Sequence, residues 1–528
     1  MKAFLILAAI CIVALVRPYF GQRFFETVEA RCARFANSRW ATLWIGLAIF
    51  IFSIALTSIY RLPQPRIHDE FSYLLQSDTF AHGHLANPTH PLWRYFETFH
   101  VLQQPTYASK YQPGQGLFLA LGQIICNPIL GAWISTALAI AALFWMLRAL
   151  FAPGWALAGA ALAALNAQVL WWNWSFWGGC VPMFGGALVL GGMFRTLKNI
   201  TPTASIAIGV GAGLLAVTRP FEGAALCAVA GVVCLWSFWK TARLNALIRF
   251  AAPVLIGAIP FITFDLIYNE RVTGHPLKPP YAVYEKTYSR NALFIWQADP
   301  QNDRNHRAEI NGFYDDEKRD ANMQRSFSGF IRGLWPKLKL YDRYFLHGLL
   351  ALMLIPASFL WRTRPLRICL FMFIALVTLT LCSSFWAQPH YSAPILPLFI
   401  ALVLFGFTQL HTIERTRLLA RMLFIGLCLL GLTMFTTRLW KDQNTQWQYK
   451  RADMIAALNK LPNKQLVLIH YAPKHNPKTE WIYNRADIDA AHVVFAPDGD
   501  AEYLKPLLSY FKGYDVSHIE PDRPMWGD

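Results

Sequence analysis

The composition of the chain indicates an integral membrane protein. Its 528 residues are 55% hydrophobic and 15% charged, whereas soluble proteins carry about 25% charged residues, and this difference excludes a soluble protein. The net charge of +17 does not indicate nucleic-acid binding, because the Arg and Lys residues punctuate apolar segments instead of clustering on one soluble face. The nine cysteines lie mostly in or beside apolar segments, so neither a disulfide framework nor a CxxC metal site is predicted.

Twelve apolar segments are predicted to cross the membrane as helices, which requires roughly 17 to 25 apolar residues each. The first, fifth and sixth are short for a crossing. The first also resembles a signal peptide, but its cleavage would leave the Arg-rich residues 17–39 outside, so we predict an uncleaved helix. The segments are Met1–Val16, Ala41–Tyr60, Ile129–Leu150, Trp155–Trp171, Val181–Phe194, Ser205–Val217, Gly223–Trp239, Phe250–Tyr268, Phe345–Trp361, Ile368–Phe385, Ser392–Leu410 and Met422–Thr436.

Basic residues divide the connections between these segments into two sets. One set is rich in Arg and Lys residues, so the positive-inside rule places it in the cytoplasm. Among the short connections of the opposite set, Arg219 is almost the only fixed positive charge. The basic set includes Arg17, Arg23, Arg31, Arg34, Arg39, Arg148, Arg195, Lys198, Lys240, Arg243, Arg249, Arg362, Arg364, Arg367, Arg415, Arg417 and Arg421.

Three long polar segments share the outer side and set the domain plan. We predict an N-terminal helix with a basic cytoplasmic segment at 1–40 and a transmembrane core at 41–437, with outer loops at 61–113 and 270–343. Residues 438–528 are predicted to form a small α/β domain outside the membrane. The fold class expected is therefore an all-α polytopic membrane protein with a small C-terminal α/β domain.

The predicted elements of this C-terminal domain alternate along the chain. Apolar runs at Gln465–Tyr471, Ala491–Ala496 and Tyr514–Ile519 are typical of strands. Residues Ala501–Phe511 are predicted to form a short helix between the second and third strands. No Gly-rich phosphate-binding loop accompanies them.

Two adjacent acids, Asp69 and Glu70, stand beside His68 at the start of the first outer loop, just after a predicted span. Acidic side chains at a membrane boundary are costly to desolvate, which favours a functional role. A carboxylate there can orient or deprotonate an acceptor hydroxyl, or hold a divalent cation. The alternative is that one of them only caps a helix over Phe71–Phe80.

The acid pair, the helix at Phe71–Phe80 and the Pro-containing segment Lys110–Gly116 follow one another in the first outer loop. In this order they resemble the GT-C superfamily of polytopic glycosyltransferases, which includes protein O-mannosyltransferases and the aminoarabinose transferase that modifies lipid A. The resemblance covers roughly residues 41–436 by topology, and only the first loop by motif. It implies that Asp69 is the catalytic or metal-associated acid, with Glu70 as a second acid.

Two features depart from the family pattern. The second outer loop, Trp171–Gly179, contains no acid, which leaves Glu97 or Glu222 as substitutes and leaves open a divalent cation (Mg²⁺, Mn²⁺ or Zn²⁺) at Asp69. The Lys-Pro-Pro sequence that is usual in the family is replaced here by Lys110-Tyr-Gln-Pro113. The Trp-rich loop can stack on a sugar, line an acyl groove or form an aromatic belt.

Seven further residues are candidates for substrate binding. Lys110 and Arg219 are candidates for a lipid phosphate, whereas Glu222 can equally form a local ion pair with Arg219. His390 and Tyr391 either line a sugar cavity or serve as interfacial anchors. His68 is one of five loop histidines whose spacing fits no standard zinc site. The seven are His68, Glu97, Lys110, Arg219, Glu222, His390 and Tyr391.

The leading hypothesis is a membrane glycosyltransferase that moves one sugar, with inversion, from a polyprenyl-phosphate donor to an acceptor on the outer face of the membrane. The expected partners are that donor, a glycan, lipid or protein acceptor, and membrane lipids, with no nucleic acid. The expected location is the bacterial inner (plasma) membrane with the active site on the periplasmic face. The alternatives are a secondary transporter, which usually shows internal repeats, and a non-catalytic envelope-assembly protein.

Overall fold

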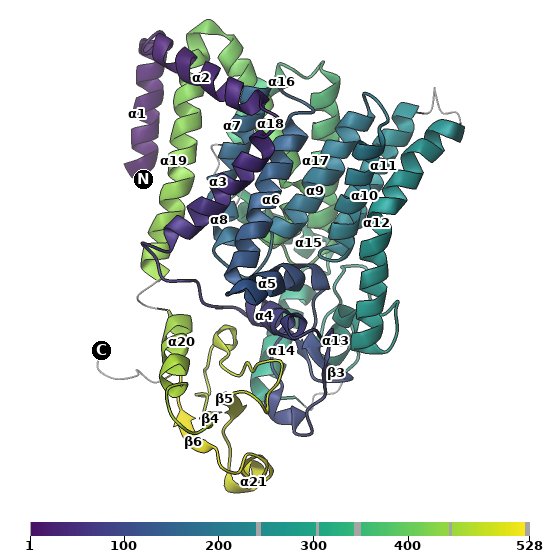
Figure 1. The fold of residues 1–528 in the computed structure, drawn as a ribbon, viewed down its shortest axis with the longest axis vertical. Helices are drawn as coiled ribbons and strands as arrows, with labels where there is room; N and C mark the ends of the chain where they lie inside the picture. Colours follow the sequence, from purple (N-terminus) through teal and green to yellow (C-terminus); the bar gives the residue numbers. More distant parts are fainter. Residues whose placement is uncertain (1, 239–243, 303–305, 343–349, 443–445, 523–528) are drawn as a thin grey trace.

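The computed structural model describes residues 2–238, 244–302, 306–342, 350–442 and 446–522. A bundle of helices occupies one end of the molecule, and a small domain with a β-sheet occupies the other (Figure 1). The predicted combination of a helical core and a small C-terminal sheet is thus confirmed.

Six helical segments among the described residues are long and apolar enough to cross a membrane, or eight if each of two bent pairs counts as one. The prediction of twelve spans is therefore not confirmed. The described part of the predicted segment Phe345–Trp361 forms only short helices, and residues 343–349 lie outside the described residues. The six are α6 (Ile129–Leu147), α11 (Pro220–Phe238), α12 (Leu244–Thr273), α17 (Arg364–Ser383), η4 (Pro389–Ile395) with α18 (Leu396–Thr412), and η5 (Glu414–Thr416) with α19 (Arg417–Asp442).

The remaining bundle helices are shorter or bent. The first bent pair, α2 and α3, turns by 107°, and the second, α7 and α8, by 66°. A helix of 15 residues spans about 22 Å, less than the roughly 30 Å hydrocarbon core. The shorter helices are therefore too short to cross the membrane alone. These helices are α1 (Lys2–Val16), α2 (Gln22–Asn37), α3 (Ala41–Leu56), α7 (Pro153–Ala164), α8 (Ala167–Asn173), α9 (Cys180–Thr196), α10 (Pro202–Ala216), η3 (Ala351–Met353) and α16 (Leu354–Ser358).

Helix α2 lies across the end of the bundle, while α1 contacts α19, the last bundle helix (Figure 1). The sequence of α2 alternates Arg and Glu with Phe and Ala, so it is amphipathic and suits a membrane surface. Glu29 of α2 accepts two hydrogen bonds from Arg421, at 2.7 and 2.8 Å, which tie α2 to α19.

Glycines allow the central helices α9, α10 and α12 to approach closely. A Cβ on Gly209 of α10 would lie 2.0 Å from the carbonyl oxygen of Val254 in α12, and one on Gly211 would lie 2.5 Å from that of Gly185 in α9. Such close backbone contact between small residues is how helices gain packing energy inside a membrane.

Two long loops form a layer of short elements beyond the bundle. The helix predicted at Phe71–Phe80 is confirmed as α4, whereas α5 was not predicted, because its Gly-rich start reads as a loop. The layer consists of α4 (His68–Ala81), β1 (Asn87–Pro88), η1 (Trp93–Phe96), β2 (Val101–Leu102), β3 (Thr106–Ser109), α5 (Pro113–Ile125), α13 (Pro280–Tyr288), α14 (Ala308–Met323) and α15 (Phe327–Tyr341).

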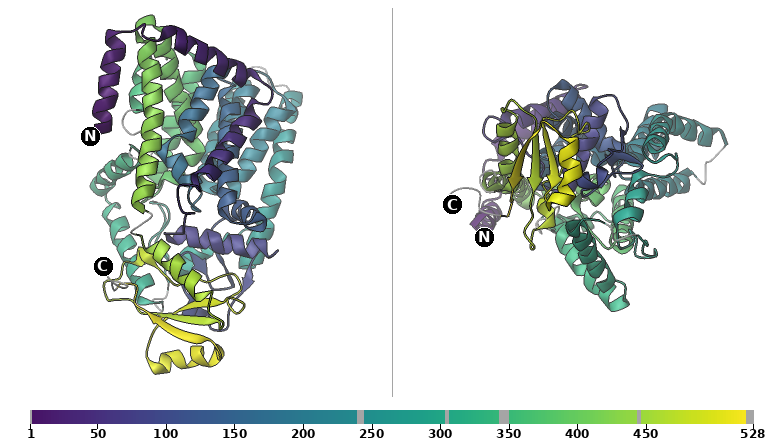
Figure 2. Two further views of the ribbon diagram at one scale, coloured as in Figure 1. Left: turned by 60° about the vertical axis from the view of Figure 1, so that its left-hand side comes forward. Right: turned by 90° about the horizontal axis from the view of Figure 1, so that it is seen from below.

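The C-terminal domain contains a three-stranded parallel sheet in the order β5-β4-β6. The three predicted strands and the predicted helix are confirmed. Central strand β4 is buried along its whole length, as expected for a parallel strand covered on both faces. Figure 2 shows the domain lying over the first long loop. Its elements are α20 (Trp447–Leu458), β4 (Gln465–Ile469), η6 (Pro477–Thr479), β5 (Val493–Pro497), α21 (Ala501–Tyr510) and β6 (Asp515–Ile519).

Candidate active site

A cavity of about 900 Å³ lies where the bundle meets the loop layer. Arg219 and Glu222 line it from the start of α11, and Tyr391 lines it from η4. Tyr281 and Glu285 line it from α13 of the second long loop. The structure therefore brings together three of the predicted substrate-binding residues, Arg219, Glu222 and Tyr391, although they come from different parts of the chain.

Asp69, in the first turn of α4, pairs with the ring of His100. Its Oδ1 lies 3.0 Å from Nδ1 of His100, and the two side chains are 19% and 14% exposed. The hydroxyl of Tyr111, a residue of the cavity wall, lies 3.0 Å from the same nitrogen. An ionised carboxylate only accepts hydrogen bonds, so this nitrogen carries the hydrogen.

The charge on Asp69 is set by competing effects. Burial alone would raise the pKa of Asp69, but His100, together with His390 and Lys110, outweighs it and leaves the pKa below its usual range. Asp69 is therefore ionised at neutral pH. An ionised, partly accessible carboxylate beside a cavity can accept a proton from a bound hydroxyl.

His100 holds an unusual backbone conformation. Its φ angle of 61° makes it the one non-glycine residue with positive φ in the part of the chain that the structure describes. The N–H of His100 donates to the hydroxyl of Tyr284 at 2.7 Å, and its carbonyl accepts from Ser72 Oγ at 2.6 Å and from the N–H of Lys110 at 3.1 Å. Strained residues held in this way cluster at functional sites. From the sequence, His100 is only one of five loop histidines, because no local pattern indicates a positive φ.

The two predicted phosphate ligands, Lys110 and Arg219, are both held by aromatic rings. The ammonium of Lys110 lies 4.8 Å from the ring centre of Tyr281 and 4.6 Å from that of Tyr284, and 3.5 Å from Glu285. Arg219 lies over the ring of Tyr391 at 5.1 Å. Tyr281, Tyr284 and Glu285 were missed, although tyrosines three residues apart on one helix face were visible in the sequence.

Glu317 of α14 is a further acid of this region that was not predicted. Burial raises its pKa to about 7, with Glu285 and Asp69 adding to the effect and Lys110 opposing it. Glu317 can therefore exchange a proton near neutral pH.

Glu70, the second predicted catalytic acid, does not reach the cavity. It is buried, and its carboxylate accepts hydrogen bonds from the N–H groups of Arg66 at 2.9 Å and Phe176 at 3.0 Å. The bond to Arg66 matches the capping alternative, because it satisfies an amide that precedes the first turn of α4. Burial raises the pKa of Glu70, although these bonds and the Arg66 charge oppose the rise. Glu70 therefore connects the loop before α4 to the Trp-rich loop.

His68 and Glu97 also lie away from the cavity. His68 Nε2 lies 2.7 Å from the carbonyl oxygen of Pro477 in the C-terminal domain. Glu97 accepts a hydrogen bond from Tyr288 at 3.2 Å and pairs with His306 at 2.8 Å. Both residues face the junction of the loops with the C-terminal domain, which the sequence could not locate.

His390 and the Trp-rich loop lie deeper in the protein. The ring of His390 contacts those of Trp177 at 4.7 Å and Tyr391 at 4.8 Å. Its Nδ1 has no hydrogen-bond partner among the described residues. Trp171 and Trp174 are buried, so they form neither an exposed aromatic belt nor an open surface for a sugar.

A divalent cation at Asp69 stays a prediction. Among the residues described by the structure, no group of three or more His, Cys, Asp or Glu side chains could hold a metal ion. Divalent cations need several such ligands, while the Oδ1 atom of Asp69 is already paired with His100. Arg219 and Lys286 are cations among the residues that line the cavity, and Lys110 lies against its wall residues Tyr111 and Tyr281.

Comparison with solved structures finds similarity over most of the chain. ArnT from Cupriavidus metallidurans in the apo state is 14% identical with a TM-score of 0.48, covering 90% of this chain and 88% of that chain. The same protein bound to undecaprenyl phosphate is 14% identical with a TM-score of 0.47, covering 91% of this chain and 90% of that chain. An Archaeoglobus fulgidus oligosaccharyltransferase tethered with an acceptor peptide is 13% identical with a TM-score of 0.40, covering 87% of this chain and 64% of that chain.

Both of these proteins are GT-C glycosyltransferases, the superfamily that the first outer loop resembles. No protein-family model and no curated protein matches this sequence. At TM-scores below 0.5 we take no residue role from the similar structures.

Proposed function

We propose that this protein is a membrane glycosyltransferase that transfers a sugar from a polyprenyl-phosphate donor to an acceptor hydroxyl in the cavity. One observation carries the proposal: an ionised carboxylate, Asp69, pairs with His100, which contacts Tyr111 of the wall of a large cavity. The half-buried Arg219 lines this cavity, and the buried Lys110 lies against its wall residue Tyr281. This arrangement offers a base for the acceptor and positive charge for the phosphate.

Each of the three charged residues has its own task in the proposed reaction. Asp69 accepts the proton of the acceptor hydroxyl, whose oxygen attacks the anomeric carbon of the sugar. The bond from that carbon to the phosphate oxygen breaks in the same displacement, which inverts the configuration. The polyprenyl phosphate leaves, and Arg219 and Lys110 stabilise the charge that develops on it. Arg219 can grip phosphate with two parallel hydrogen bonds, whereas Lys110 acts as a point charge.

The distribution of charge supports a site on the outer face. Among the described residues, the basic connections between α1 and α2, between α16 and α17 and between α18 and α19 lie at the end of the bundle opposite to α4, α13 and the C-terminal domain (Figure 1). The positive-inside rule then places the cavity on the outer side, which in a bacterium is the periplasmic face of the plasma membrane.

Lipid analysis tests this proposal. We expect cells lacking the protein to accumulate one lipid-linked sugar and to lose one sugar from an envelope glycan, lipid or protein, as measured by mass spectrometry. Cells carrying Asp69→Asn should show the same two changes, and the wild-type gene should reverse both. An unchanged lipid pool, with a defect in the uptake of a solute instead, would favour a transporter and refute the proposal.

Purified protein in liposomes gives the second readout. Undecaprenyl phosphate is the first lipid to test, and its binding should protect wild-type protein and Asp69→Asn equally from thermal unfolding. Loss of this protection in Arg219→Gln would support a phosphate site in the cavity.

A further inference from the structure

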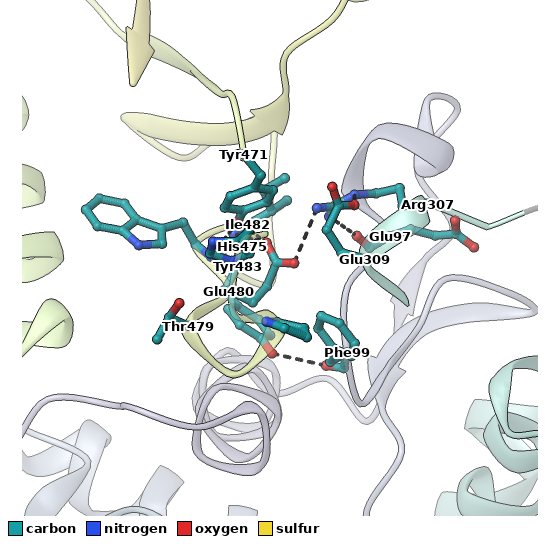
Figure 3. Close-up of polar contacts among 12 residues, drawn as sticks. Glu97, Phe99, Arg307, Glu309, Tyr471, His475, Thr479, Glu480, Ile482 and Tyr483 are labelled. Carbon is teal, nitrogen blue, oxygen red and sulfur yellow. Dashed lines mark hydrogen bonds and ion pairs between the residues drawn. The ribbon is translucent and has the colours of Figure 1, made fainter. Parts of the chain in front are cut away.

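The C-terminal domain contacts the first long loop through the docking segment, which we define as residues 475–483. Within it, Pro477 accepts a hydrogen bond from His68 at 2.7 Å, and Tyr483 donates one to the carbonyl of Phe99 at 3.4 Å. Figure 3 shows the bond between Tyr483 and Phe99. The contacts fall on the residues that directly precede Asp69 and His100 in the chain.

A buried ion pair fixes the docking segment in place. Glu480 is 0% exposed, and its carboxylate accepts from the N–H of Ile482 at 2.8 Å and from Arg307 of the second long loop at 3.3 Å. Arg307 also donates to the carbonyl of Glu97 at 3.0 Å (Figure 3). A buried carboxylate needs such partners, so the ion pair holds the docking segment in a defined position against the two loops.

His68 is held too firmly to bind a substrate. Its ring stacks on that of Phe99 at 4.1 Å with an angle of 3°, and meets the ring of His100 edge-on at 5.4 Å. Since a carbonyl only accepts, Nε2 of His68 carries the hydrogen. Burial, with the neighbouring charge of His100, lowers the pKa of His68 to about 3, so the ring is neutral at physiological pH.

We propose that the C-terminal domain positions the Asp69–His100 pair, and that His68 is the positioning residue through which the domain acts. This inference rests on the proposed function, because it gives the pair a catalytic task. Pro477 orients the ring of His68, the neighbour of Asp69. Tyr483 holds the carbonyl of Phe99, which directly precedes the strained backbone of His100.

Attachment of the domain alone does not account for these contacts. Apolar packing and the ion pair of Arg485 with Asp78, at 2.9 Å, already join the domain to α4 on its other face. A site that loses about 1 Å of alignment can lose about a hundredfold in rate. A contact that sets the angle of His68 therefore changes turnover without changing what the cavity binds.

The kinetic test uses His68→Phe, which keeps the stacked ring and removes the bond to Pro477. The assay uses full-length protein in liposomes and the lipid-linked sugar that accumulates in cells lacking the protein. We expect kcat to fall at least tenfold while the donor KM stays within twofold. The matched control is His475→Phe in the docking segment, because His475 stacks on Tyr471 at 3.9 Å and pairs with Asp522 at 2.8 Å within the domain. The proposal fails if His68→Phe keeps wild-type kcat per folded molecule, or if His475→Phe loses as much kcat as His68→Phe.

A spectroscopic test is independent of sugar transfer. In full-length protein with ¹⁵N-labelled histidine in nanodiscs, His68→Phe and Glu480→Gln should both shift the ring nitrogen signals of His100, and His475→Phe should not. Signals are assigned by their loss in His68→Phe and in His100→Asn. Unchanged His100 signals in both test variants would overturn the positioning role. If the signals shift but wild-type protein transfers no sugar, positioning stands and the proposed function falls.

Discussion

The two faces of helix α4 are built from different interactions. One face carries Asp69, Ser72 and Gln76, whose side chains bond to His100 and to the backbone of Tyr111, a residue of the cavity wall. The opposite face carries Phe71, which stacks on Tyr483 at 4.1 Å, and Asp78, which pairs with Arg485. One face thus aligns polar groups, and the other face attaches a domain. Substitutions on the first face should change rate, and those on the second should change stability.

The largest effect is expected at Asp69. Asp69→Asn keeps the shape of the side chain and removes the base, so turnover should fall by about 10² to 10⁴-fold while the unfolding temperature stays close to that of the wild type. Purified protein in liposomes, with product measured by mass spectrometry, checks this. Near-normal turnover would show that Asp69 does not supply the base.

The next largest effects are expected at Arg219 and Lys110, the two cations proposed to hold the phosphate. Arg219→Lys loses paired hydrogen bonds to phosphate, and Lys110→Met loses a point charge while filling the same space, so each should lower kcat/KM by roughly ten to a hundredfold. Because these residues are proposed to hold the donor, the donor dependence should change more than the acceptor dependence. Kinetics with the two substrates varied separately measure this, and unchanged donor dependence in both variants would make the two residues ordinary interfacial charges.

Glu70 tests whether the neighbour of Asp69 shares its task. Glu70→Gln keeps one acceptor oxygen for the amides of Arg66 and Phe176 but loses the charge, which should cost about 1–3 kcal/mol of stability. Turnover per folded molecule should fall far less than in Asp69→Asn, since adjacent helix positions point about 100° apart. Thermal unfolding in detergent, followed by assay of the folded fraction, separates the two effects.

The smallest effect is expected on the opposite face of α4. Burial raises the pKa of Asp78, but its bonds with Arg485 and the N–H of Ala486 outweigh this and leave the pKa lowered from 3.8. The depressed pKa means that the stabilisation is present above pH 3.8 and is lost as the pH falls through the lower folded value. Asp78→Asn should therefore cost about 1 kcal/mol or less at pH 7, with no change in turnover, and the difference from wild type should vanish in acid. A constant difference in unfolding temperature from pH 7 to pH 3 would contradict this.

The sequence predicted what depends on local pattern. The acid pair and the family resemblance indicated α4, and apolar runs placed the strands of the C-terminal domain. The rarity of acids and cations at the outer ends of helices pointed to Asp69 and Arg219. The roles of Glu70 and His68 depend on distant partners: Phe176 is 106 residues from Glu70, and Pro477 is 409 residues from His68. Periodicity carries no information on such contacts, so two adjacent acids that look alike in the sequence take different places in the structure.

The same limit explains why twelve spans were predicted and why the role of His100 was not. Apolar segments were counted by composition, but α7 and α8 bend at Asn166, whose side chain caps α8. His100 owes its place to hydrogen bonds from Ser72 and to Tyr284, which belong to different loops. The backbone angle appears only when both loops are in position.

The contact between α1 and α19 has a consequence for how the protein is made. Ribosomes deliver the chain from its N-terminus, so α1 enters the membrane long before its partner exists. Until α19 is synthesised, α1 has lipid in place of protein along that side, and the amphipathic helix α2 is the element that can hold it at the membrane surface. Insertion of the bundle therefore ends with a closing step, in which the last helix docks on the first.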